Sequence, residues 1–132
     1  MRMRIDEFGG SILKIILLLS MLFCHIVDDY YLQGILAKMK QKSFWQENAP
    51  KPLYKNDYVM ALIEHSFSWT FMIHIPIIIA YKEVDLVWFI GTVFIHAVVD
   101  NLKANDLSIN LIQDQIIHIL QVVATWLFYI FV

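Results

Sequence analysis

The chain has 132 residues, enough for one domain, but 59% of them are hydrophobic and only 17% are charged. This balance, with a mean hydropathy of +0.60, excludes an ordinary soluble domain and indicates an integral membrane protein. The net charge of -2, with no basic face interleaved with aromatic residues, argues against a nucleic-acid partner. A single cysteine excludes an internal disulfide and any metal site built on several cysteines.

Four hydrophobic segments are long enough to cross a hydrocarbon layer of about 30 Å as helices. The first begins near residue 11, and we expect its helix to continue to about residue 37. An interfacial connection covers 38–57, and the other three spans cover about 58–81, 85–103 and 108–132. The sequence therefore predicts an all-α, polytopic membrane protein, a single transmembrane domain (1–132) folded as an up-down bundle of four transmembrane helices.

The first predicted helix carries polar residues directly behind its apolar run, in the stretch HIVDDYYLQ. His25, Asp29 and Gln33 are spaced four residues apart, so they share one side of the helix. Asp28 is offset from this stripe, which makes Asp29 the better partner for His25.

The later helices repeat this design. In the second, His65 lies about two turns from the start, whereas His74 falls on roughly the opposite side. We expect His74 to hydrogen-bond to a neighbouring helix near the Pro76 kink. The third and fourth helices carry polar stripes at intervals of three or four residues: His96, Asp100 and Lys103, then Asp114, His118, Gln121 and Thr125. In an up-down bundle all four clusters share one membrane face, at a depth of roughly 10 Å.

The histidines and aspartates at this common depth form a candidate metal site. Ionisable groups in a membrane cost about 2.5–3.5 kcal/mol each, so they usually face the bundle interior and have partners. Imidazoles and carboxylates are ligands that zinc, iron and manganese take, and a divalent cation would offset the buried negative charge. The alternative is that these histidines and aspartates only form hydrogen bonds between helices and hold the bundle together. The expected ligands of one or two divalent ions, with zinc favoured and iron or manganese as alternatives, are His25, Asp29, His65, His96, Asp100, Asp114 and His118.

An open coordination position on such an ion would make the site catalytic. The metal lowers the pKa of water enough to give a nucleophile near neutral pH, and Glu64 or Asp28 could then act as the base. Lys103 could bind a phosphate or carboxylate of the substrate, or it could only extend to the membrane surface. We expect Gln33 and Gln115 to orient the ligands from outside.

The polar stripes form one pattern over most of the chain: His25-x-x-x-Asp29-x-x-Leu32-Gln33, His65, His96-x-x-x-Asp100-x-x-Lys103 and Asp114-Gln115-x-x-His118. From about residue 15 to 125 this pattern resembles a family of small bacterial and phage membrane proteins catalogued as a domain of unknown function. The chain is more distantly similar to membrane-bound proteins described as metal-dependent hydrolases. The resemblance implies a four-helix membrane fold. It does not extend to residues 1–10, and Tyr30-Tyr31 stands where the family often has a phenylalanine type.

The basic residues favour one orientation in the inner membrane of the cell. On the side of the clusters lie Lys38, Lys40, Lys42, Lys51, Lys55 and Lys103. The opposite side has Arg2, Arg4 and Lys82, with Lys14 inside the first span. The positive-inside tendency therefore places the clusters at the cytoplasmic face, although the MRMR start argues the other way.

Three functions are compatible with the sequence. The leading hypothesis is a membrane-embedded, metal-dependent hydrolase that acts on a lipid-linked or membrane-proximal substrate. The second is an ion or proton transporter, which needs a polar path across the membrane, whereas the far halves of the first and third helices are nearly all apolar. The third is a structural or regulatory subunit that docks on a membrane complex through its aromatic fourth helix. A homo-oligomer is compatible with each of the three.

Overall fold

The computed structural model describes residues 10–132, which are mostly helical and contain no strand. The long helices are α1 (Ser11–Ile26), α4 (Asp57–Tyr81), α5 (Leu86–Ala104) and α6 (Leu111–Phe131). α1 continues as the π-helix η2 (Val27–Leu32), and the connection to α4 contains α2 (Leu36–Met39), α3 (Lys42–Asn48) and the 3-10 helix η3 (Pro52–Tyr54). The MRMR start used in the orientation argument lies outside the described residues.

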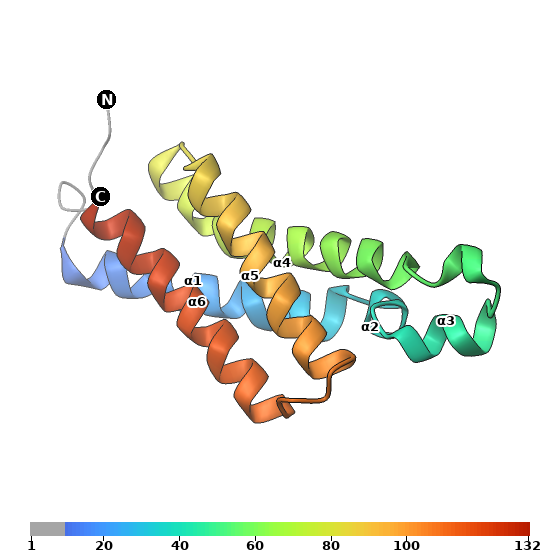
Figure 1. Cartoon of the computed structure of the whole chain (residues 1–132). Helices are drawn as coiled ribbons and strands as arrows, with labels where there is room; N and C mark the ends of the chain where they lie inside the picture. Colours follow the sequence, from blue (N-terminus) through green and yellow to red (C-terminus); the bar gives the residue numbers. More distant parts are fainter. Residues whose placement is uncertain (1–9) are drawn as a thin grey trace.

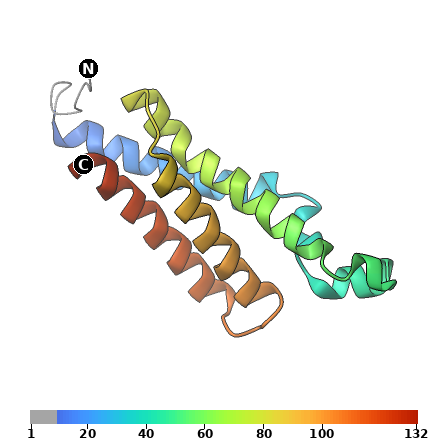
Figure 2. The same ribbon diagram turned by 45° about the horizontal axis from the view of Figure 1, so that its top comes forward.

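Consecutive long helices run in opposite directions, as Figure 1 and Figure 2 show. The short connections on either side of α5 enforce this order, because a short turn makes antiparallel neighbours. The segment with α2, α3 and η3 projects beyond one end of the bundle, beside the start of α4 (Figure 1). The four long helices, α1 counted together with η2, are long and apolar enough to cross a membrane, which confirms the predicted all-α fold with four such segments.

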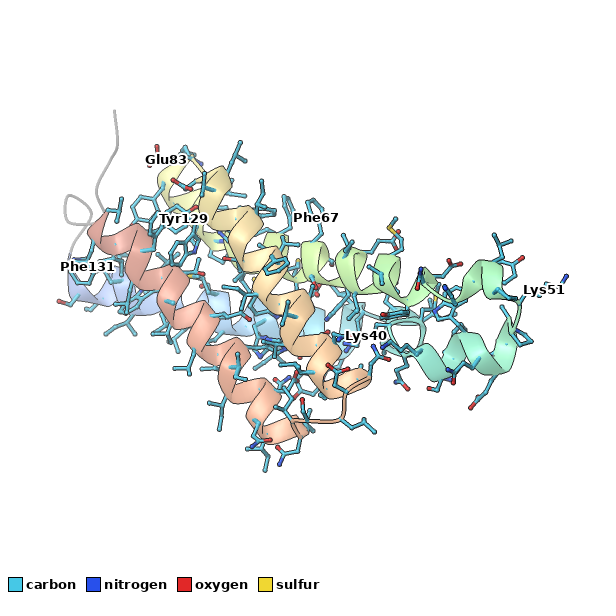
Figure 3. The ribbon with its side chains drawn as sticks, in the orientation of Figure 1. Lys40, Lys51, Phe67, Glu83, Tyr129 and Phe131 are labelled. Carbon is cyan, nitrogen blue, oxygen red and sulfur yellow. The ribbon has the colours of Figure 1, made fainter. Side chains whose placement is uncertain are left out.

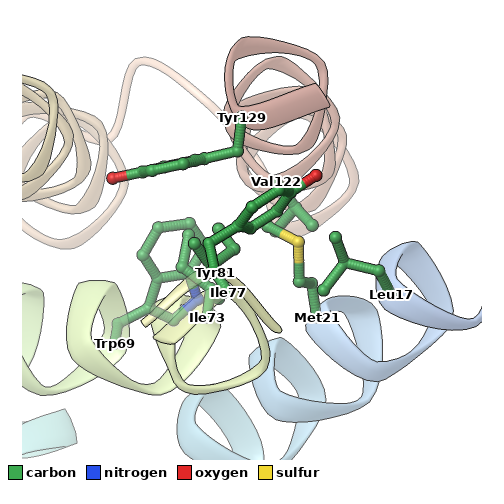
Figure 4. Packing of buried hydrophobic residues seen from close by; sticks show 8 residues of the cluster. All are labelled: Leu17, Met21, Trp69, Ile73, Ile77, Tyr81, Val122 and Tyr129. Carbon is green, nitrogen blue, oxygen red and sulfur yellow. The ribbon is translucent and has the colours of Figure 1, made fainter. Parts of the chain in front are cut away.

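An apolar core fills the rest of the bundle and meets the polar clusters at Trp69. Figure 4 shows its eight buried residues, which come from α1, α4 and α6: Leu17, Met21, Trp69, Ile73, Ile77, Tyr81, Val122 and Tyr129. Many other large apolar side chains are exposed on the outside of the bundle, among them Phe23, Val87 and Phe131. An outer surface with so much apolar area is unfavourable in water and suits a lipid environment.

The first helix ends earlier than the sequence predicts. Instead of continuing to residue 37, the helical segment formed by α1 and η2 ends at Leu32, and the chain turns at Gly34, whose φ of 52° lies in the left-handed region that favours glycine. Within η2 the Gln33 N–H donates to the Asp28 carbonyl at 3.1 Å, five residues back. Both consecutive carboxylates, Asp28 and Asp29, are buried there, although ideal α-helical geometry would rotate them about 100° apart.

Gly34→Ala is expected to destabilise the fold by about 1–2 kcal/mol, because alanine is strained at this φ. The strain comes from the backbone alone, since an added Cβ would meet only the Leu32 carbonyl oxygen, at 3.9 Å. Gly91→Ala is the matched control: Gly91 lies inside α5 with open space around a Cβ, and alanine there should stabilise by about 0.5–1 kcal/mol. Reversible unfolding in detergent micelles measures both variants, and effects of the same sign would contradict this account.

Candidate metal centre

Polar side chains from η2, α4, α5 and α6 converge inside the bundle, near the end from which α2 projects. Six of the seven predicted metal ligands meet there, each at most 4% exposed: Asp29, His65, His96, Asp100, Asp114 and His118. Their common level follows from the up-down order, which places the ends of the first and third long helices beside the starts of the second and fourth.

His65 of α4 lies at the centre of the cluster. Its Nε2 atom is 3.3 Å from His96 Nε2, 3.3 Å from Asp29 Oδ1 and 3.4 Å from Asp100 Oδ2. Four ligand atoms around a tetrahedral ion at about 2.1 Å lie about 3.4 Å from one another. The three separations from His65 therefore have the length that a tetrahedral site requires.

His118 and Asp114 extend the cluster on the other side of Asp100. His118 Nε2 lies 3.1 Å from Asp100 Oδ1 and 3.2 Å from Asp114 Oδ1. Asp100 thus faces His65 with one oxygen and His118 with the other. Two groups of ligand atoms are close enough to hold an ion, and they share one histidine: Asp29, His65 and His96, and His96, Asp100 and His118.

Several buried polar atoms of the cluster have no hydrogen-bond partner among the described residues: Asp28 Oδ2, Asp29 Oδ1, His65 Nδ1, His96 Nδ1 and Asp114 Oδ1. A buried polar atom left without a partner costs about 1–3 kcal/mol, so several in one place are unusual for a complete hydrogen-bond network. The oxygens of Asp29 and Asp114 each face the Nε2 atom of a histidine. A cation between such atoms would satisfy both.

Two lysines offset part of the negative charge of the cluster. Lys40 Nζ donates to Asp100 Oδ2 at 2.6 Å, and Lys103 Nζ donates to Asp114 Oδ2 at 2.5 Å. With the two carboxylates of η2 included and the imidazoles neutral, four carboxylates and two ammonium groups leave a formal charge of -2. One divalent cation, or two protonated histidines, would balance this charge.

His25 lies beside these ligand groups and not within them. Trp69 Nε1–H donates to His25 Nδ1 at 2.8 Å, and an indole nitrogen can only donate, so Nδ1 is the unprotonated acceptor. The ring proton is therefore on Nε2, which donates to Gln115 Oε1 at 3.2 Å. Both ring nitrogens of His25 are used in this way, and neither is left for an ion.

Gln115 and Gln33, predicted to orient the ligands, both contact Asp29. The Gln115 amide nitrogen donates to Asp29 Oδ2 at 2.6 Å and to Asp114 Oδ2 at 3.2 Å. Gln33 donates to the backbone carbonyl of Asp29. The hydrogen bond from His25 fixes the orientation of the Gln115 amide, so His25 positions two carboxylates that it does not touch.

Trp69→Phe tests this chain of hydrogen bonds. Phenylalanine keeps an aromatic ring against His96, which stacks on Trp69 at a centroid distance of 4.1 Å, but removes the N–H that fixes His25. We expect metal affinity to fall about 10- to 100-fold, as for other outer partners of ligands, and nitrogen-15 NMR to show that the His25 proton is no longer confined to Nε2. Trp126→Phe is the control, because that indole donates to the Lys14 carbonyl. Equal losses of affinity in the two variants would contradict the assignment.

The three predicted catalytic residues occupy different places. Asp28 is buried, and its Oδ2 lies 3.8 Å from His65 Nδ1, where a carboxylate can orient a ligand imidazole. Glu64 is exposed on the outer face of α4. The Lys103 side chain is 25% exposed and is paired with a carboxylate of α6. The structure thus brings Asp28 and Lys103 to the cluster and leaves Glu64 outside it.

His118 is oriented by a neighbour on its own helix. Gln121 Nε2 donates to the Thr92 carbonyl at 3.4 Å, which turns its Oε1 toward His118 Nδ1 at 3.1 Å. Nδ1 therefore carries a proton, and Nε2 faces the carboxylates of Asp100 and Asp114. An imidazole held in this way can bind a metal through Nε2, or can take a second proton there.

Comparisons of the chain with protein-family models, curated proteins and solved structures find no match. The resemblance to small bacterial and phage membrane proteins therefore stays a prediction. The function of the cluster has to be argued from its own atoms and their surroundings.

Lys40 is the cluster residue that sequence reasoning missed. It ends the short helix α2, in a segment predicted to lie among lipid headgroups, yet it is only 4% exposed, and Figure 3 labels it where that segment meets the bundle. Asn105 fastens the segment, since its amide donates to the Lys40 carbonyl at 3.0 Å and its Oδ1 accepts from the Lys42 N–H at 2.7 Å. No local pattern links Lys40 to Asp100, 60 residues on, because the pairing depends on the turn at Gly34.

His74 is fully buried but lies apart from the cluster. Its Nδ1 atom is 2.7 Å from the Thr70 carbonyl, one turn back in α4, and its ring packs against Phe89 and Tyr129. Among the described residues its Nε2 has no hydrogen-bond partner. The expected hydrogen bond to a neighbouring helix is therefore replaced by one within α4.

Proposed function

We propose that this protein is a membrane metalloprotein that holds one divalent ion between His65 Nε2, His96 Nε2 and Asp29 Oδ1, with the fourth position open to water. The observation that carries the proposal is that His96 Nε2 and Asp29 Oδ1 each lie 3.3 Å from His65 Nε2, with Asp29 Oδ1 otherwise unpartnered among the described residues. Zinc fits two imidazoles and one carboxylate with water completing a tetrahedron, and iron or manganese would take the same donors with added positions. One such ion also balances the formal charge of the cluster.

The membrane setting is part of this proposal. The four long apolar helices cross the inner membrane of the cell as an up-down bundle, which puts the cluster near one face, close to the lipid headgroups. The connection between η2 and α4 carries five of the eight lysines in the described part of the chain, so the positive-inside tendency assigns this end to the cytoplasm.

Hydrolysis of a lipid-linked or membrane-proximal substrate is the reaction that suits the site. A divalent ion there would activate water and polarise the bond to be cleaved. His118 faces Asp100 and Asp114 and is not needed as a ligand of a single ion, so it is placed to take the proton from water. Asp28, behind His65, orients that ligand.

Elemental analysis of the purified full-length chain tests the metal claim. We expect about one equivalent of zinc, iron or manganese per chain after expression in a metal-replete medium, and the same after removal by a chelator and reloading. A chain that keeps its fold but binds no stoichiometric metal after repletion would contradict the proposal.

Proton or ion transport is the second candidate, and one observation favours it. Beyond the cluster, polar contacts continue between α5 and α6 toward the opposite end of the bundle, through the pairs Gln121–Thr92, Trp88–Thr125 and Asp85–Tyr129. Protonated histidines, and not a metal, would then balance the carboxylates. Ion flux in proteoliposomes that is lost in His96→Ala, in protein without bound metal, would rank transport first.

A further inference from the structure

A groove runs along the outside of the bundle between α1–η2 and α6, beside the cluster. It has a volume of about 610 Å³, within the range of small-molecule sites. Its apolar walls include Leu22, Ile26 and Ile119, and its polar side is formed by His25 and Gln115. In both ribbon views α1–η2 and the start of α6 diverge toward this end of the molecule (Figure 1, Figure 2).

The polar side of the groove lies next to a partly exposed cation. Gln115 Nε2 and Lys103 Nζ both donate to the same oxygen, Asp114 Oδ2, at 3.2 and 2.5 Å. The side chain of Lys103 is 25% exposed, whereas that of Lys40 is 5% exposed. An ammonium group has three donors, so Lys103 can bind an anion without releasing Asp114. The apolar groove and this cation together match an amphiphile with a negative head.

We propose that the groove binds one acyl chain of a phospholipid whose anionic headgroup is held by Lys103. This inference rests on the proposed function, because it takes the membrane setting and the metal centre as given and names the substrate class. Ile26 and Ile119 are 47% and 42% exposed on the outer face, which contacts acyl chains in that setting. The charge of Lys103 selects a negative head among the lipids that reach this face. Asp114 Oδ1 is 3.2 Å from His118 Nε2, so the carboxylate of Asp114 connects Lys103 directly to a histidine of the cluster.

Photocrosslinking of the full-length protein in lipid nanodiscs tests the groove. The probe is phosphatidic acid with a diazirine on its acyl chain, and phosphatidylcholine with the same chain is the comparison. We expect phosphatidic acid to label α1–η2 and α6 at the groove, and Ile119→Trp to reduce this labelling at least tenfold. Leu120→Trp is the matched control, because its residue is also exposed on α6 but does not line the groove. Lys103→Gln should remove the preference for phosphatidic acid, and Lys55→Gln, at an exposed position, should not.

Metal content is measured on the same samples, so failure of the groove and failure of the metal centre can be told apart. Equal labelling of the wild-type chain and Ile119→Trp overturns the proposal that the groove binds lipid, whether or not metal is bound. Labelling that depends on Ile119 and Lys103 in a chain without metal supports lipid binding in the groove and contradicts the proposed metal centre. A dimer that Ile119→Trp breaks, without loss of labelling, assigns the groove to a second copy of the chain and overturns the lipid proposal.

Discussion

Replacing His65 with alanine is expected to abolish stoichiometric metal binding. The Nε2 atom of His65 lies within 3.4 Å of three other candidate ligand atoms. Its loss therefore removes the donor atom that is close to each of the others. We expect the dissociation constant for zinc to rise more than about 100-fold, beyond the 10- to 100-fold typical for loss of an outer partner. Calorimetric titration of the detergent-solubilised protein measures it.

His74→Ala is the control for this experiment. His74 lies on the same helix and is buried to the same degree as His65, but it contacts Thr70 and an aromatic group instead of the cluster. Its removal has a comparable cost in packing and should leave zinc affinity unchanged. Wild-type affinity in His65→Ala, or equal losses in the two variants, would contradict the ligand assignment.

Lys40→Met is expected to destabilise the metal-free protein by about 3–5 kcal/mol, because it leaves the buried carboxylate of Asp100 without its compensating charge. The side chains of the pair are 5% and 0% exposed, so water screens the interaction little, and methionine keeps much of the aliphatic volume. Zinc should recover part of the loss, since an ion bound to His65 Nε2, which lies 3.4 Å from Asp100 Oδ2, supplies positive charge beside that carboxylate. Unfolding in mixed micelles with and without zinc measures the difference.

The companion variants separate charge from packing. Lys38→Met alters an exposed lysine on the same short helix and should change the free energy of unfolding by less than about 0.5 kcal/mol. Combining Lys40→Met with Asp100→Asn should cost less than the sum of the two single changes, because the uncompensated charge is then gone. An equal cost of Lys40→Met with and without zinc would show that the ion does not supply positive charge beside Asp100.

The convergence of the polar stripes could be predicted because helical periodicity is a local property of the sequence. His96 with Asp100, and Asp114 with His118, are four residues apart, so each pair faces one side of its helix. Short connections then make neighbouring helices antiparallel, which brings the polar ends together. The length of the hydrophobic segments predicted the four long apolar helices that the structure confirms.

The roles within the cluster could not be predicted, because they depend on contacts between helices. His25 and His65 are equivalent in the sequence pattern, yet Trp69 donates to Nδ1 of His25 and Gln115 accepts from its Nε2, and both partners lie on other helices. Lys40 reaches the interior only because the chain turns back after η2. With α-helical periodicity, Asp28 was expected to lie to one side of the stripe formed by His25 and Asp29. Nothing in the residue pattern predicts the π-helical turn that buries it.

The burial of both carboxylates of η2 depends on the number of residues in this π-helix. Its turns hold about one residue more than α-helical turns, as the bond from Gln33 back to Asp28 shows. A π-turn holds one extra residue without turning the parts of the helix that flank it, so deleting one codon between positions 27 and 32 would restore α-helical hydrogen bonding and leave α1 in the same orientation relative to the chain that follows. Leu17 and Met21 would still face the apolar core, whereas Asp28 and Asp29, about 100° apart in an α-helix, could no longer both face inward. A reading-frame-preserving deletion of the same size in the exposed connection around Lys51 would leave both in place.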